Sequence, residues 1–409
     1  MSGGASEPMP GASRASLPPL LLVVGENPQL ARTDNVTIRN TRSRYHAVVR
    51  WSVSMTVVTA CSSPAAMVDA PPASADATPA RLVVYASGTS PDIHWYTIDP
   101  TTAALTPAGS IPAFAANPSF LAIAPSGHYL YAVSEATSRV GAYAIDAATG
   151  ALTFIDDVAV GGSGPAHVAV DRGGHFVLVA NYGDGTVSTF PIAANGAVGA
   201  AQQTLTAGSH AHMIITDPGN HFALVPCLGS NYVGQYVFDP ATGMLSANSV
   251  PHAMTAAGAG PRHIAFAADA LHAYVIDELD STITAFAYDA QTGRLSAPTT
   301  ASTLSAPKAG NTGAEIIVDG AFVYGSNRGD NSIVTLTTEG GTLAPIGWTP
   351  TGGMTPRSFA QRGNLGLVAN QGSNTIVSFT ITTGTWTASG ATTPFTGPEF
   401  VAIVALPDS

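Results

Sequence analysis

The chain is poor in charge, and lysine is almost missing. Only 10% of its 409 residues are charged, and its 15 cationic side chains include one lysine, Lys308, against 26 acidic residues, for a net charge of −11. Binding to a nucleic-acid backbone requires a basic stripe that neutralises phosphates. This sequence has no such stripe, and we expect no nucleic-acid partner.

Cysteine and long apolar runs are also scarce. The chain has 2 cysteines, Cys61 and Cys227, and no run of about 18 apolar residues, so we expect neither a disulfide framework nor a conventional spanning helix. With 45% apolar residues over this length, the chain can bury a large core without a metal or a disulfide. It also has no G-x-S-x-G, H-E-x-x-H or P-loop string. We expect no cofactor, and motif matching alone indicates no reaction.

The first 80 residues resemble an export signal more than a domain. An arginine-rich patch, Arg39–Arg50, precedes the apolar string WSVSMTVVTAC, whose Val58–Cys61 matches a bacterial lipobox. We predict that residues 1–61 are a disordered extension with a lipoprotein-type signal, that Cys61 is lipidated, and that residues 62–80 form a Pro/Ala/Asp-rich linker. The protein would then be a cell-envelope lipoprotein, periplasmic or at the surface, that contacts the membrane only through its anchor.

Two alternatives stay open for this segment. The Val-Thr-Ala-Cys string can be accidental in a poorly ordered extension, which would leave the protein in the cytoplasm. Translation can also begin near Val48, and the residues before it would then be a mis-assigned extension. If Cys61 carries lipid, Cys227 is left unpaired, and we expect it to be a small packed residue.

From Leu82 onward the chain repeats one pattern seven times. Each copy has an apolar run, a small or amide anchor residue, a polar turn and an alternating run that ends nine positions after the anchor. The anchors are Ser87, Ser134, Asn181, Cys227, Asp277, Asn327 and Asn370. They lie 47, 47, 46, 50, 50 and 43 residues apart, and the period of two is typical of four-stranded blades rather than helix pairs. We predict an all-β fold, a seven-bladed β-propeller over residues 81–406.

A second repeated segment, such as GPAHVAVDR at residues 164–172, precedes each anchor except the first. We call this segment the second element. One further copy, GPEFVAIVA at residues 397–405, stands alone after the last anchor, whereas the first repeat lacks an inner strand near residue 82. We therefore predict that the C-terminal strand joins the N-terminal blade and closes the ring, which leaves no open sheet edge.

Arginine is rare in the repeats, and three arginines fall at matching positions. Arg262 and Arg357 lie just before the inner-strand start in GPRH and TPRS, and Arg328 directly follows its anchor. Glu278 follows the anchor of the preceding repeat. Because the copies are related by rotation about one axis, equal register means equal height and radius. We expect these side chains to meet at one end of the central channel and to bind a small anionic or polar ligand.

One position of the second element carries ionisable side chains. It holds a histidine in three successive repeats and Glu315 in the next, the histidines being His167, His212 and His263. In SHAH, His210 and His212 have i, i+2 spacing, which on a strand would put both on one face. Two imidazoles can hold a metal, but no third ligand is visible in the sequence, and we predict no metal site.

Purely structural roles are the alternatives for these residues. Arg328 and Glu278 can form a salt bridge between blades without any ligand. The register histidines can be hydrogen-bonding core residues that cap strand ends. Asn327 can cap a turn, with ligand contact as its other role.

Several strings, in order along the chain, resemble those of the seven-bladed lactonase family. That family includes the propeller-type 6-phosphogluconolactonases and is similar to the fungal carboxymuconate cyclases. The strings are SHAH (209–212), GPRH (260–263), DELDSTITAFAYD (277–289), SNRGDNSI (326–333) and VANQGSNTIVSF (368–379). The resemblance spans about residues 82–405 and implies a seven-bladed propeller with its site at the channel mouth. It implies a catalytic cluster of four residues, His212, Arg262, Glu278 and Arg328.

The chemistry that the resemblance implies is hydrolysis of a carboxylic ester within a ring. Arg262 and Arg328 would hold a carboxylate or phosphate and stabilise the oxyanion that forms when water attacks a lactone carbonyl. Glu278 or His212 would be the base. The candidate ligand-binding residues are His167, His210, His263, Glu315, Arg357 and Asn327.

Other functions fit the same sequence. A carboxymuconate-type cycloisomerase would use the same anion-binding arginines with a proton donor, and a non-catalytic envelope propeller would bind protein or glycan. A calcium-dependent lactonase would need acidic and amide ligands around the axis, where Arg328 would repel the cation. If Cys61 is lipidated, an extracytoplasmic lactone is a better substrate than a cytosolic sugar phosphate.

Overall fold

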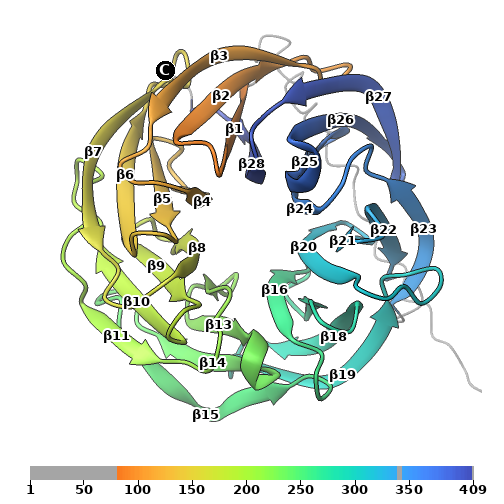
Figure 1. The fold of residues 1–409 in the computed structure, drawn as a ribbon. Coiled ribbons are helices and arrows are strands. Elements are labelled where there is room, and N and C mark those ends of the chain that lie inside the picture. Colours follow the sequence, from red (N-terminus) through yellow and green to blue (C-terminus); the bar gives the residue numbers. More distant parts are fainter. Residues whose placement is uncertain (1–80, 339–342, 408–409) are drawn as a thin grey trace, which may run out of the picture. The chain divides into compact units, whose positions relative to one another are not determined.

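The computed structural model describes residues 81–338 and 343–407. The predicted signal at 1–61, with Cys61, and the predicted linker at 62–80 lie outside these residues. The described residues form seven antiparallel sheets of four strands each, arranged as blades around one axis (Figure 1). The predicted all-β, seven-bladed propeller is confirmed.

The strands follow one another from the axis outward in each blade. Blade 1 contains β28 (Pro398–Ala405), β1 (Leu82–Gly88), β2 (Asp92–Ile98) and β3 (Leu105–Pro112); blade 2 contains β4 (Pro118–Ile123), β5 (Tyr129–Ser134), β6 (Arg139–Ile145) and β7 (Leu152–Ala159). Blade 3 contains β8 (Pro165–Val170), β9 (Phe176–Asn181), β10 (Thr186–Pro191) and β11 (Gln203–Thr206); blade 4 contains β12 (Ile215–Thr216), β13 (Phe222–Cys227), β14 (Tyr232–Phe238) and β15 (Leu245–Met254).

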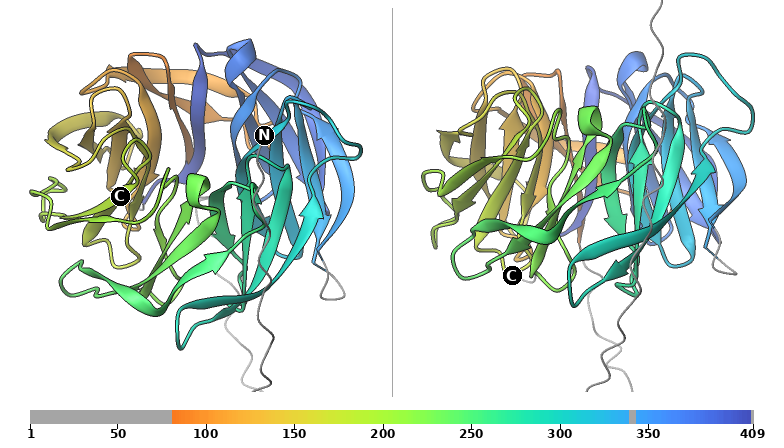
Figure 2. Two further views of the ribbon diagram at one scale, coloured as in Figure 1. Left: turned by 60° about the horizontal axis from the view of Figure 1, so that its bottom comes forward. Right: turned by 90° about the horizontal axis from the view of Figure 1, so that it is seen from below.

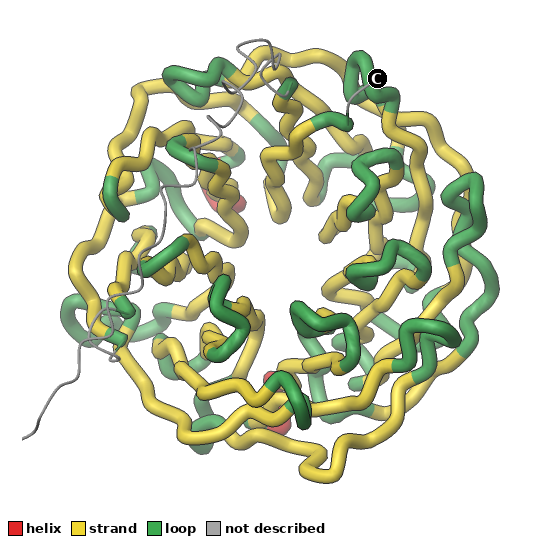
Figure 3. The backbone as a smooth tube through the Cα atoms, turned by 180° about the vertical axis from the view of Figure 1, so that it is seen from behind, coloured by secondary structure: helices red, strands yellow, loops and turns green. Residues whose placement is uncertain are grey.

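The remaining three blades repeat this order. Blade 5 contains β16 (Pro261–Phe266), β17 (His272–Asp277), β18 (Thr282–Asp289) and β19 (Arg294–Ser302); blade 6 contains β20 (Thr312–Asp319), β21 (Phe322–Arg328), β22 (Ser332–Thr337) and β23 (Ala344–Pro350). Blade 7 contains β24 (Pro356–Arg362), β25 (Leu365–Asn370), β26 (Thr375–Thr382) and β27 (Thr385–Pro394). Helix in the described part of the chain consists of the 3₁₀ turns η1 (Leu228–Ser230) and η3 (Gln371–Ser373) (Figure 3).

Closure of the ring joins the two ends of the repeat region. Strand β28 pairs with β1 from Leu82↔Ala405 to Gly88↔Pro398, so the last strand in sequence is the inner strand of blade 1. The predicted closure is confirmed, and it satisfies the backbone groups of an edge that would otherwise be open.

The apolar cores lie between neighbouring blades. Val84 of blade 1, for example, packs in one cluster with Leu367 and Ile376 of blade 7. Both faces of a blade are therefore covered, and β9 is buried at every one of its 6 positions. A strand with two covered faces needs a nearly continuous apolar run, which explains strings such as FVLVAN. Figure 2 shows the blades from the side.

The anchors are fully buried and tie the turn that follows them. The amide of Asn181 donates to the hydroxyls of Thr186 at 3.0 Å and Ser188 at 3.2 Å. In blade 5, the Asp277 carboxylate accepts hydrogen bonds from the equivalent hydroxyls, Thr282 at 3.2 Å and Thr284 at 2.6 Å. These bonds fix the end of the second strand of the blade, and they thereby fix the position of the residue after the anchor.

Candidate active site

A β-bulge at the start of the inner strands sets the site. In blade 5, Pro261 pairs with Asp277 and His263 pairs with Ile276, which leaves Arg262 as the extra residue. A bulge turns a side chain away from the simple alternation of a strand. Arg262 and His263 are therefore both buried, at 3% and 1% exposure, although they are adjacent in sequence. The same register shift occurs next to Arg357 in blade 7 and next to Glu399 in blade 1.

We call the end of the inner strands that carries these bulges the bulge rim. Glu278 and Arg328 also lie there, because each follows its anchor at the end of the strand paired with the inner strand. The Oε2 atom of Glu278 lies 3.1 Å from Arg262 Nε and 2.9 Å from Arg328 Nη2. The structure thus brings these three side chains together.

Carbonyl oxygens hold both guanidinium groups in place. Arg262 Nη1 donates to Ala314 O at 2.5 Å, and Arg328 Nη2 donates to Gly313 O at 2.8 Å. Within the described residues, Arg262 Nη2 and Arg328 Nη1 make no hydrogen bond. Each arginine is thus fixed by one part of its fork and keeps another part free for an anion.

A buried His–Glu pair supports Arg262 from below. His263 Nδ1 lies 2.8 Å from Glu315 Oε1, and its Nε2 lies 3.3 Å from Arg262 Nη1. Burial lowers the pKa of His263, although the Glu315 charge opposes this shift. For Glu315, burial raises the pKa, but His263 and Arg262 outweigh burial and leave the pKa below its usual value. A neutral imidazole that donates from Nδ1 to the carboxylate presents its Nε2 lone pair to Arg262.

Aromatic rings close the axis below the arginines. Phe120 of blade 2 lies 5.7 Å from His263 of blade 5 between ring centroids, and His167 lies 5.7 Å from the same ring. Phe120 also contacts Phe400 at 4.7 Å, and His212 lies 5.1 Å from His263. Rings from blades on opposite sides therefore touch, and this layer is a floor under the arginine cluster.

His212 and His167 are held neutral. The prediction that His212 shares the register of His263 is wrong by one position, because Ala211 pairs with the anchor Cys227 as Pro261 pairs with Asp277, which makes His212 the equivalent of Arg262 at the bulge rim. Burial lowers the pKa of His212 well below 6.5, and the neighbouring charge of Arg262 lowers it further. His167 is affected in the same way by burial, His263 and Arg262. Burial and Arg328 lower the pKa of Arg262 to about 9, against the opposing effect of Glu278, so the guanidinium stays charged at neutral pH. The site therefore combines charged arginines with imidazoles that are neutral at neutral pH.

Three candidate residues differ from their expected placement or partners. His210 is not on a strand with His212; it has φ 56° and stacks its exposed ring 4.4 Å from Tyr182. Asn327 is fully buried, and both groups of its amide are bonded internally, to Thr303, Asn311 and Ser332. Arg357 lies half-buried at the bulge rim and makes no hydrogen bond or ion pair with the described residues.

Sequence reasoning missed two residues at the rim. Tyr182 follows its anchor, as Glu278 and Arg328 do, and its ring lies 5.5 Å from that of His212. Glu399 occupies the bulge position of blade 1, the equivalent of Arg262 in blade 5. The repeat register contains the signal for both, because each stands at a repeat position that carries an ionic residue in another blade.

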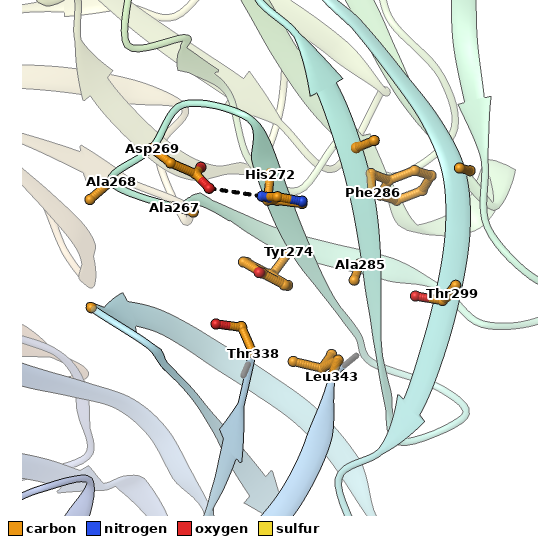
Figure 4. Close-up of a pocket in the computed structure, with 13 residues that line it drawn as sticks. Ala267, Ala268, Asp269, His272, Tyr274, Ala285, Phe286, Thr299, Thr338 and Leu343 are labelled. Atoms are coloured by element: carbon orange, nitrogen blue, oxygen red, sulfur yellow. Dashed lines mark hydrogen bonds and ion pairs between the residues drawn. The ribbon is translucent and has the colours of Figure 1, made fainter. Parts of the chain in front are cut away.

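A cavity of about 350 Å³ lies elsewhere, at the far end of blade 5 (Figure 4). Its wall includes Tyr274, Thr338 and the exposed pair His272 Nδ1–Asp269 Oδ2, 2.9 Å apart. These residues stand at the opposite ends of β16 and β17 from Arg262 and Asp277. The cavity holds none of the ionic groups of the bulge rim.

Two other properties concern metals and membranes. Among residues 81–338 and 343–407, no group of three or more His, Cys, Asp or Glu side chains is arranged to hold a metal ion. In the same residues, no helix has the length and apolar character needed to cross a membrane.

Comparisons with known proteins agree on one family. The family described as "Lactonase, 7-bladed beta-propeller" matches residues 82–404. An uncharacterized protein of Lactococcus lactis is 32% identical over 244 residues, which cover 56% of this chain and 70% of the relative. A 6-phosphogluconolactonase of Formosa agariphila is 32% identical over 285 residues, 64% of this chain and 81% of the relative. The solved structure of the periplasmic gluconolactonase of Pseudomonas aeruginosa superposes with a TM-score of 0.72 at 26% identity, covering 80% of this chain and all of that one.

Proposed function

This chain belongs to the seven-bladed β-propeller lactonase family, and we propose that it opens a sugar-type or other small polar lactone at the bulge rim. The observation that carries the proposal is the shared Oε2 atom of Glu278, 3.1 Å from Arg262 and 2.9 Å from Arg328. One carboxylate between two arginines fixes both forks and leaves Arg262 Nη2 and Arg328 Nη1 free to donate. Such an arrangement favours a ligand atom that carries or develops negative charge.

The proposed mechanism assigns one task to each group. The free N–H groups of Arg262 and Arg328 stabilise the oxyanion that forms when water attacks the lactone carbonyl, and they then hold the product carboxylate. His212, neutral and at the same rim, takes the proton from water and returns it to the ring oxygen as that oxygen leaves. Glu278 keeps the two guanidinium groups in position. The ring opens by addition of one water, and no other reactant is needed.

The test is opening of glucono-δ-lactone by the purified full-length protein. At pH 6.5, a pH-stat should record acid release faster than in buffer, and Arg328→Ala should lower kcat/KM by about 10²–10³, the usual effect of removing one oxyanion donor. Arg362→Ala is the matched control, because Arg362 is exposed at the other end of β24 from Arg357. A rate equal to buffer across a panel of lactones would refute lactone hydrolysis and favour a binding propeller.

We also propose that Cys61 anchors the protein to the cell envelope. The lipobox Val58–Cys61 supports this proposal, as does the periplasmic location in the name of the Pseudomonas aeruginosa relative. Mass spectrometry of the native N-terminus tests it. A diacylated N-terminal cysteine at position 61 is the expected result, and a native chain that starts upstream of Val58 without lipid would refute it.

A further inference from the structure

Glu399 is an acidic residue at the bulge rim that the proposed mechanism does not use. It is the extra residue where β28 pairs with β1, because Ser87 pairs with Phe400 and Gly88 pairs with Pro398. Its position in blade 1 is equivalent to that of Arg262 in blade 5 and of Arg357 in blade 7. Only 7% of Glu399 is exposed, and carboxylates are rarely buried to this degree without a cation.

Amide groups from two other blades hold this carboxylate. Gln371 Nε2, after the anchor of blade 7, donates to Glu399 Oε1 at 2.7 Å. Asn117 lies just before β4 of blade 2. In the amide orientation that suits both its side-chain oxygen and its side-chain nitrogen, the nitrogen donates to Glu399 Oε2 at 3.3 Å and to Gly88 O at 3.1 Å. Residues from three blades thus fix one carboxylate, which is a construction typical of a positioned acceptor.

Charge around Glu399 is not neutralised by contact. No arginine lies within ion-pair distance of it among the described residues, and the half-buried Arg357 forms no ion pair there either. Burial raises the pKa of Glu399; Arg357 opposes this shift, and Glu135 adds to it. An acceptor buried in this way is stabilised by ligand groups that donate hydrogen bonds to it.

The two halves of the rim face each other across a narrow axis. Arg262, Glu278 and Arg328 come from blades 5 and 6, whereas Glu399 and its amide donors come from blades 1, 2 and 7. One layer below, Phe120 of blade 2 and His263 of blade 5 are 5.7 Å apart between ring centroids, so the inner strands of opposite blades approach closely. A small ring whose carbonyl lies on the arginines therefore extends its other substituents toward Glu399.

We propose that Glu399, positioned by Gln371 and Asn117, determines specificity by accepting hydrogen bonds from hydroxyl groups of the substrate ring. This inference rests on the proposed lactone hydrolysis and adds a specificity-determining residue to it. A site built around a hydroxyl–carboxylate bond discriminates strongly against a lactone that has no hydroxyl, because the buried carboxylate then keeps only its two amide donors and gains no hydrogen bond from the substrate.

The experiment compares two δ-lactones with Glu399→Gln in the full-length protein. Glucono-δ-lactone carries ring hydroxyls, and δ-valerolactone has none. The wild-type ratio of kcat/KM, gluconolactone over valerolactone, should fall by about 10- to 100-fold in Glu399→Gln, in line with loss of one charged hydrogen bond. Glu399→Asp should restore part of the ratio, and Asp269→Asn, at the far end of blade 5, should leave it unchanged.

A structural role for Glu399 gives a different result. If the carboxylate only balances Arg357, Glu399→Gln should slow both lactones equally, and an unchanged ratio would refute the specificity role. Failure of the proposed function is separable, because binding of the ring-opened products does not require catalysis. Titration calorimetry with D-gluconate and 5-hydroxypentanoate should show that the wild type prefers gluconate by about tenfold or more, and Glu399→Gln should remove this preference. Equal affinities of the wild type for the two products would overturn the inference even if neither lactone is opened.

Discussion

Glu278→Gln is the substitution that most sharply separates a charged site from a structural salt bridge. The change keeps the shape of the side chain but removes the negative charge between Arg262 and Arg328. Both arginines then face each other without a counter-ion, and Arg262 keeps only 4% of its side chain exposed. Breaking a fully buried pair costs about 3–5 kcal/mol. Because 20% of the Glu278 side chain is exposed, we expect a smaller loss, about 2 kcal/mol.

Thermal unfolding measures this loss. At an unfolding entropy of about 2.1 cal/mol/K per residue, a propeller of about 325 residues shifts by about 1.5 °C per kcal/mol, so Tm should fall by about 3 °C. Glu135→Gln is the matched control, since Glu135 also follows an anchor, Ser134, but makes no ion pair within the described residues. Its Tm should stay within about 1 °C of the wild type, because this change breaks no ion pair.

Added anion gives the second readout. Two uncompensated guanidinium groups should bind sulfate, so 10 mM sulfate, compared with chloride at equal ionic strength, should raise the Tm of Glu278→Gln more than that of the wild type. The variant should also lose about 10²-fold or more in kcat/KM on glucono-δ-lactone, because the oxyanion donors are no longer fixed. An unchanged Tm together with the same sulfate response in both proteins would refute the role given to Glu278.

Two other predictions concern pH. Because burial and Arg262 hold the pKa of His212 well below 6.5, the imidazole is already neutral at pH 6.5. Wild-type kcat/KM should therefore stay level from pH 7.5 down through 6.5 and fall only at lower pH. His212→Asn should lower kcat/KM by about 10²–10⁴. An inflection at or above pH 6.5 would contradict the assignment of His212 as base. Burial raises the pKa of Asp277 to about 7, above the unfolded value near 3.9, so the wild-type protein loses stability as pH rises through this range. Asp277→Asn, which copies the Asn181 bonds of blade 3, should therefore gain about 1–3 kcal/mol more at pH 8 than at pH 5 in urea unfolding, and a gain that is independent of pH would count against this reasoning.

Rotational register explains how much of the site is visible in the sequence. Arg262, Glu278 and Arg328 lie at defined positions of a repeated unit, so their convergence follows from the symmetry of the ring without any knowledge of side-chain contacts. The same logic predicted that β28 would complete blade 1. Both predictions depend on backbone periodicity, which a single sequence displays.

Contacts across the axis are not visible in the same way. The ring contacts of Phe120 with His167 and His263 depend on how far the inner strands approach each other, and repeat spacing does not specify that distance. The bulge that buries Arg262 and His263 together also breaks the alternation of side chains that a regular strand would show. His210 was misplaced for a related reason, because positive φ ends the strand geometry that i, i+2 spacing assumes.

A crystal structure of the full-length protein with D-gluconate tests the central claim most directly. The account predicts that the gluconate carboxylate lies within hydrogen-bond distance of Arg262 and Arg328, beside the ring of His212. Gluconate bound away from the bulge rim, for example in the cavity beside Asp269 and His272, with the arginine cluster unoccupied, would contradict it.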